Sequence, residues 1–144
     1  MIWEHIEGFS QNEKWGKPGS VNGLLLFLLT IVRKEFRKFF DPAASFVIHN
    51  AYDTSGHATD SQHYKGNAAD FHIDTSISYK DQIAILLDIF KDLQVEDRVG
   101  FGIYPQWNNK GFHLDVRGTR ARWGQIDGKY VSMSEALIKE DLKL

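Results

Sequence analysis

The strongest constraint on the fold is the alternation of apolar and polar residues in several short segments. Residues 112–117, Phe112-His-Leu-Asp-Val-Arg117, show it most clearly. Successive side chains of a β-strand point to opposite faces of a sheet, so this segment predicts a strand with one apolar and one polar face. Residues 45–52, 67–73 and 99–104 are also typical of strands. The chain therefore contains a β-sheet with two chemically different faces.

Three segments instead show the spacing and capping of helices. Residues 22–40 form a helix that Asp41-Pro42 ends, because the residue before a proline disfavours the helical conformation. Ser78 caps a second helix, and Ser132 opens a third with Glu135 in a capping box. Asp127-Gly128 predicts a tight hairpin turn. We therefore expect an α+β fold, a small and mostly antiparallel sheet with helices packed on one side.

Length and composition narrow the class of protein. The 144 residues predict a single domain over 1–144. A net charge of −2 argues against nucleic acid as a partner, and the lack of cysteine excludes thiolate metal sites. The apolar run over residues 24–32 is about half of the ~20 residues that a membrane span needs, so a buried helix is expected. The first residues lack the pattern of a secretory signal.

Two of the predicted strands carry a histidine and a carboxylate on the same face. Asp70 and His72 share a face of one strand, and His113 and Asp115 share a face of another. A strand can carry polar residues on one face simply because that face is exposed to solvent. This explanation is weaker for two strands that both carry a histidine and a carboxylate. With His63 in the preceding loop, three ligands become available, which is the number that a catalytic zinc site takes from the protein.

The segment Ser61-Gln-His63-Tyr-Lys-Gly66-Asn-Ala68-Ala-Asp70 reproduces the Ser-x-His-x-x-Gly-x-Ala-x-Asp signature of the M15 metallopeptidases. Gly111-Phe-His113-Leu-Asp-Val-Arg-Gly118 resembles the second histidine block of the small stand-alone members. The resemblance implies a fold like that of the hedgehog domain and the D-Ala-D-Ala peptidases. It also implies that His63, Asp70 and His113 are the ligands of Zn²⁺.

By this resemblance, the chain hydrolyses peptide bonds in peptidoglycan stem peptides or cross-links, as a carboxypeptidase or an endopeptidase. Zinc would polarise the scissile carbonyl and lower the pKa of a bound water toward ~7. We expect a monomeric enzyme of phage or prophage origin, made in the cytoplasm. It would reach the cell wall after release through a holin pore or as part of a virion.

The sequence lacks the usual general base of the family. Many relatives have an acidic residue or a histidine at the positions that Lys110 and Gly111 occupy here. Asp115 is the first candidate for this catalytic role, His72 is the second, and a residue elsewhere is the third. Asp115 has two alternative roles: it would orient a ligand histidine, or it would form a salt bridge with Arg117.

A second departure is Asn50-Ala-Tyr52-Asp53, where relatives often read Ser-Gly-Tyr-Arg. Arg117 or Arg120 is then expected to supply the missing positive charge. We expect Arg117, Ser61 and Tyr52 to contact the substrate. The departures also favour an alternative function, a non-catalytic zinc-containing module that binds the cell wall or has a structural role. A third reading is a zinc hydrolase of another amide, which the identity of its products would reveal.

Overall fold

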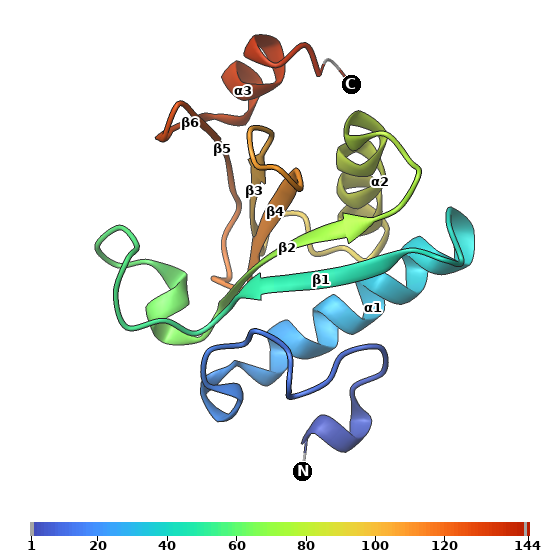
Figure 1. Cartoon of the computed structure of the whole chain (residues 1–144), viewed down its shortest axis with the longest axis vertical. Coiled ribbons are helices and arrows are strands. Elements are labelled where there is room, and N and C mark those ends of the chain that lie inside the picture. Colours follow the sequence, from blue (N-terminus) through green and yellow to red (C-terminus); the bar gives the residue numbers. More distant parts are fainter. Residues whose placement is uncertain (1, 143) are drawn as a thin grey trace.

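The computed structural model describes residues 2–142 and residue 144 (Figure 1). Short 3₁₀ helices are labelled η. In chain order the elements are η1 (Ile2–His5), η2 (Pro18–Ser20), α1 (Gly23–Phe39), β1 (Ser45–Asn50), η3 (Gln62–Lys65), β2 (Ala68–Asp74), α2 (Tyr79–Asp92), β3 (Gly100–Tyr104), β4 (Gly111–Asp115), β5 (Ala121–Ile126), β6 (Lys129–Ser132) and α3 (Met133–Lys139).

The six strands form one sheet in the order β1-β2-β4-β3-β5-β6. Every neighbouring pair is antiparallel except β3 and β5, which run parallel. Asp127 and Gly128 join β5 to β6 with φ angles of 51° and 76°, as the two central residues of a tight hairpin turn require. The predicted α+β fold with a mostly antiparallel sheet is confirmed.

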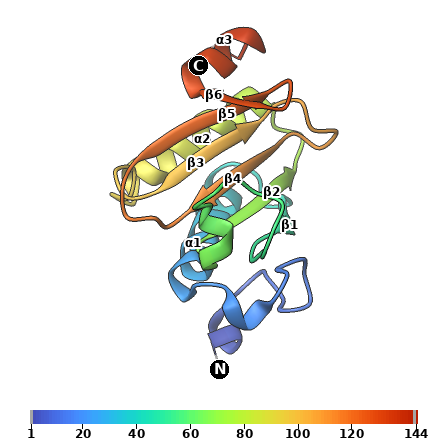
Figure 2. The ribbon, with the colours of Figure 1, turned by 90° about the vertical axis from the view of Figure 1, so that its left-hand side faces the viewer.

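The helices cover one face of this sheet, where the hydrophobic core lies (Figures 1 and 2). On α1, the ring of Phe36 packs edge-on against Phe46 of β1, with ring centroids 5.6 Å apart. On α2, Phe90 meets Phe101 of β3 in the same way at 5.1 Å. The short α3 packs on β5 near the other edge of the sheet. The opposite face is left for polar residues.

Each of the three α-helices begins at a capping side chain, and the caps predicted at Ser78 and Ser132 are confirmed. The side chain of Asn22 accepts a hydrogen bond from the backbone N–H of Leu24 at the start of α1. Ser78 and Ser132 accept from backbone N–H groups in the first turns of α2 and α3. Each cap satisfies a donor that has no partner within the helix. Among the described residues, no helix is long and apolar enough to cross a membrane.

Tyr79, in the first turn of α2, ties the helix layer to the strands below the polar face. Its buried hydroxyl donates to the carbonyl of Gly111, 2.6 Å away, and accepts from the N–H of Tyr104 at 3.1 Å. Burial raises the pKa of the Tyr79 phenol, so it stays a neutral donor. These bonds fix the last residue of β3 and the first residue of β4.

Candidate metal centre

His63 is held by a short turn that the sequence specifies locally. Ser61 caps η3 by accepting a hydrogen bond from the His63 N–H, 3.2 Å away. Gly66 ends the turn at φ 72°, and a Cβ atom there would lie only 1.9 Å from the Ser20 carbonyl oxygen. Glycine is therefore required at this position, both for the left-handed conformation and for the close approach of the chain.

Asp70 and His113 come from neighbouring strands and stand opposite each other in the pairing of β2 with β4. The sequence separates them by 43 positions, but the register places their side chains side by side on the polar face. His113 Nδ1 lies 3.1 Å from Asp70 Oδ1, and His63 Nε2 lies 3.3 Å from Asp70 Oδ2. Asp70 therefore joins the two histidines.

Together His63, Asp70 and His113 form a buried group that could hold a metal ion. One ligand atom from each lies within 4.8 Å of the other two, and the three residues are 2–4% exposed. His63 Nε2 is buried without a hydrogen-bond partner among the described residues. A buried nitrogen without a partner is costly, and a metal ion would use its lone pair. The donor set of two imidazoles and one carboxylate fits a divalent transition metal such as zinc.

Hydrogen bonds on the far side of each imidazole leave the correct nitrogen free. His63 Nδ1 lies 2.6 Å from the carbonyl oxygen of Ala51, which accepts its proton. His113 Nε2 lies 2.7 Å from Asp115 Oδ2, which leaves Nδ1 directed at Asp70. Ligand histidines in metal sites are usually oriented by such partners. In this arrangement His63 offers Nε2 and His113 offers Nδ1.

The electrostatics of the group favour an ionised Asp70. Burial opposes its charged form, but the hydrogen bond with His113 and the proximity of the imidazoles of His113 and His63 outweigh burial and hold the pKa of the Asp70 carboxyl well below its ordinary value. Burial likewise opposes the cationic form of His113, yet hydrogen bonds to Asp115 and Asp70 outweigh it and raise the pKa of this imidazole. A metal ion would replace the proton that His113 attracts.

Asp115 lies behind His113, away from the ligand atoms. It is fully buried, and its two oxygens accept from His113 Nε2, from two nitrogens of the Arg117 guanidinium and from the backbone N–H groups of Gly100 and Arg117. Burial favours the neutral acid, but the bonds from Arg117 and His113 hold the pKa of the Asp115 carboxyl well below its ordinary value. This geometry fits a partner that orients His113 and disfavours the general base predicted at Asp115.

The second predicted base, His72, also has both ring nitrogens engaged. Its Nδ1 lies 2.6 Å from His49 Nε2, and its Nε2 lies 2.9 Å from Asp74 Oδ1. It lies on the polar face of β2, but it does not line the hollow that opens on His63 and His113.

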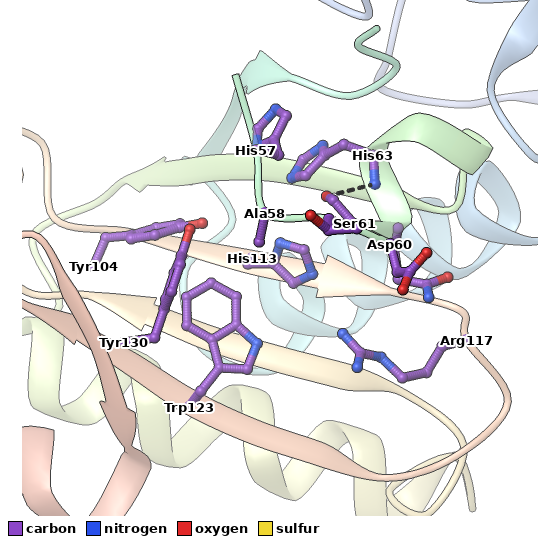
Figure 3. Close-up of a pocket in the computed structure, with 12 residues that line it drawn as sticks. His57, Ala58, Asp60, Ser61, His63, Tyr104, His113, Arg117, Trp123 and Tyr130 are labelled. Carbon is purple, nitrogen blue, oxygen red and sulfur yellow. Dashed lines mark hydrogen bonds between the residues drawn. The ribbon is translucent and has the colours of Figure 1, made fainter. Parts of the chain in front are cut away.

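A hollow of about 370 Å³ opens on the triad (Figure 3). On one side the rings of His57 and His63 stack in parallel, with centroids 4.2 Å apart. Trp123, Tyr130 and Arg117 stand on the other side, around His113. Trp123 lies flat over Gly102, where a Cβ atom would approach the indole to 2.5 Å. This ring therefore occupies the space that a side chain at Gly102 would need.

The predicted substrate contacts fall in different places. Ser61 and Arg117 line the hollow. Tyr52 does not, because its side chain packs against the hydrophobic core. Of the two arginines that could supply a positive charge, Arg120 is exposed and lies 3.4 Å from Asp97 in an ion pair. Arg120 does not line the hollow, so Arg117, whose guanidinium also pairs with Asp115, is the arginine that brings a positive charge there.

Sequence reasoning missed two contacts. The Tyr104 hydroxyl donates to Asp70 Oδ1 at 3.1 Å and adds a hydrogen bond to the carboxylate. Asp53, at the position where relatives often have arginine, instead lies 2.6 Å from His57 Nε2 and orients that ring in the wall of the hollow. The i,i+4 spacing of Asp53 and His57 was the available signal for the second contact. Nothing local signals the first, because Tyr104 and Asp70 meet through the sheet.

Comparisons of the chain with models of protein families, with curated proteins and with solved structures returned no match.

Proposed function

We propose that this chain is a zinc-dependent peptidase of the M15 type, which hydrolyses peptide bonds in peptidoglycan stem peptides or cross-links. The observation that carries the proposal is the buried triad of His63, Asp70 and His113 at the base of an open hollow, where His63 Nε2 has no hydrogen-bond partner in the described part of the chain. Structural zinc sites usually have four protein ligands, whereas catalytic sites have three and an open position. The peptidoglycan substrate and a phage or prophage origin are supported by the sequence signature.

Each residue of the site would have its own role in hydrolysis. His63, Asp70 and His113 would hold the metal, which supplies a Lewis acid for the scissile carbonyl and makes a water molecule more acidic. Asp115 and Arg117 would fix the ring of His113 from behind. Since Asp115 is fully engaged, the proton acceptor would come from the wall of the hollow. There, His57 and Asp60 supply an imidazole and a carboxylate outside the triad.

The alternative is a non-catalytic metal-binding module on the same fold. Its specific support is that both predicted bases, Asp115 and His72, are engaged by other side chains. Such a module would bind metal tightly and would bind cell-wall material without cutting it.

Mass spectrometry of peptidoglycan digested by the zinc-loaded protein separates the two functions. A peptidase produces new peptide termini, which identify the bond, and a chelator removes them. His63→Ala should also remove them, whereas His5→Ala, at an exposed histidine of η1, should not. Stoichiometric zinc without new termini would contradict the peptidase and favour the binding module.

A further inference from the structure

A second hollow, of about 410 Å³, opens beside the triad. Its walls come from the end of β1 and from the connection between β3 and β4, and one ligand of the triad completes it. The lining residues are His49, Asn50, Asp70, Trp107, Asn108 and Asn109. None of them lines the first hollow.

The two hollows lie on different sides of the triad. Asp70 and His113 stand on β2 and β4, which are adjacent in the middle of the sheet order. The first hollow extends from His113 over β3, β5 and β6, whereas the second extends from Asp70 toward the edge strand β1. Tyr104 lines the first and Trp107 lines the second, and these two rings stack with centroids 3.9 Å apart. The stacked pair marks the boundary between the hollows.

The chemistry of the second hollow differs from that of the first. Arg117 lines the first, whereas no lysine or arginine is among the described residues that line the second. Three asparagines there offer amide donors and acceptors, and the buried Oδ1 of Asn50 has no hydrogen-bond partner among the described residues. Each residue of a peptide main chain presents one donor and one acceptor, which amide side chains can pair. The lining therefore suits an uncharged peptide main chain.

The wall of the second hollow is held in place by the protein. His49 Nε2 lies 2.6 Å from His72 Nδ1, and His72 is held in turn by Asp74. The ring of Trp107 packs edge-on against His49, with centroids 5.1 Å apart. A wall that is already ordered costs less conformational entropy when a ligand binds.

We propose that the second hollow is a substrate subsite, which binds the uncharged main chain of the peptide on the side of the triad away from Arg117. This inference rests on the proposed peptidase function. A substrate then spans both hollows, with the scissile bond at the triad between them. A terminal carboxylate has no matching charge in the second hollow, because none of the described residues that line it is a lysine or an arginine. The bound peptide is therefore expected to extend beyond the first of its residues that enters the second hollow.

The test is the dependence of kcat/KM on peptide length. The zinc-loaded protein is given synthetic stem peptides that are extended by one residue at a time, at one end only. Extension at the end that enters the second hollow should raise kcat/KM by about fivefold for each hydrogen bond gained. Extension at the other end should change kcat/KM with peptide length in a different way, because those residues contact the first hollow. Equal rates for all lengths at both ends would overturn the proposal.

Substitutions in the second hollow show whether the rise of kcat/KM with peptide length comes from this hollow. Asn109→Ala, in an exposed connection, should lower the ratio of kcat/KM between the longer and the shorter peptide, and Asn50→Ala should do the same. Asn12→Ala, at an exposed asparagine of the N-terminal segment, is the matched control and should keep the wild-type ratio. Zinc content is measured for every variant. A wild-type ratio in both Asn109→Ala and Asn50→Ala would overturn the proposal.

Failure of the peptidase function is distinguishable from failure of the subsite. If no peptide is cut by the zinc-loaded protein, the proposed function fails, and binding of the longest peptide is followed by nuclear magnetic resonance. Shifts of the backbone amides at residues 49–50 and 107–109 would support a peptide site in the second hollow. Shifts confined to other residues, or no shifts, would overturn it.

Discussion

The two faces of β4 are equally buried but are stabilised in different ways. Phe112 and Leu114 point to the core and are fully buried, and the ring of Phe112 stacks with Phe101 at 5.6 Å. His113 and Asp115 point to the other face and are 4% and 0% exposed. Apolar contacts suffice on the first face, whereas every polar atom on the second needs a partner. The core face therefore contributes most to the free energy of unfolding, whereas the polar face fixes the positions of the proposed metal ligands.

The largest expected effect is on the polar face. His63→Ala removes one of the three ligands, so zinc affinity should fall by more than the about 10- to 100-fold that loss of an outer partner costs. Titration of the metal-free protein with zinc measures the change, with His5→Ala as the exposed control. Wild-type affinity in His63→Ala would place the metal elsewhere.

On the core face, Phe112→Ala should lower the free energy of unfolding by about 3–5 kcal/mol, because it leaves a cavity among buried rings. Urea denaturation of the metal-free protein measures the loss. Below the denaturation midpoint, the variant should still bind one zinc ion. A variant of normal stability that has lost zinc would contradict the division between the two faces.

Asp115→Asn tests the polar face of β4 alone, because it removes a charge while it keeps the shape of the side chain. The charged partner of His113 is lost, so zinc affinity should fall by about 10- to 100-fold. Asp97→Asn is the matched control, since Asp97 is exposed and paired with Arg120. Unchanged zinc affinity with abolished hydrolysis would instead support Asp115 as the general base.

The smallest effect is the dependence of stability on pH. The folded-state pKa of Asp115 lies below the unfolded value of about 3.9, so its contribution is present above that pH and is lost as the pH falls further. The difference in unfolding free energy between wild type and Asp115→Asn, without metal, should therefore shrink as the pH falls from about 5 to about 3. A difference that stays constant over this range would contradict the lowered pKa.

The sequence predicted the features that depend on neighbouring residues. The helix caps at Ser78 and Ser132 and the turn at Asp127-Gly128 are local, and the structure confirms them. The group of His63, Asp70 and His113 is not local, because the pairing of β2 with β4 brings it together, and it was predicted through the resemblance of its two motifs to the M15 pattern.

The sequence could not predict features that depend on strand register or on distant segments. The contacts of Asp115 with His113 and Arg117 were among its expected roles, whereas its contact with the N–H of Gly100 depends on the pairing of β3 with β4. Tyr52 was expected at the substrate, but its backbone N–H pairs with the carbonyl of Trp15 and its side chain packs on the core. That bond joins the segment after β1 to the N-terminal segment, whose fold has no periodic signal in the sequence.

The most direct test of the metal centre is a crystal of the zinc-loaded protein with anomalous diffraction measured at the zinc edge. We predict a single strong peak about 2.0–2.2 Å from His63 Nε2, His113 Nδ1 and a carboxylate oxygen of Asp70. Asp115 should remain on the far side of His113. No peak among these three residues, or a peak bound by other side chains, would contradict the assignment.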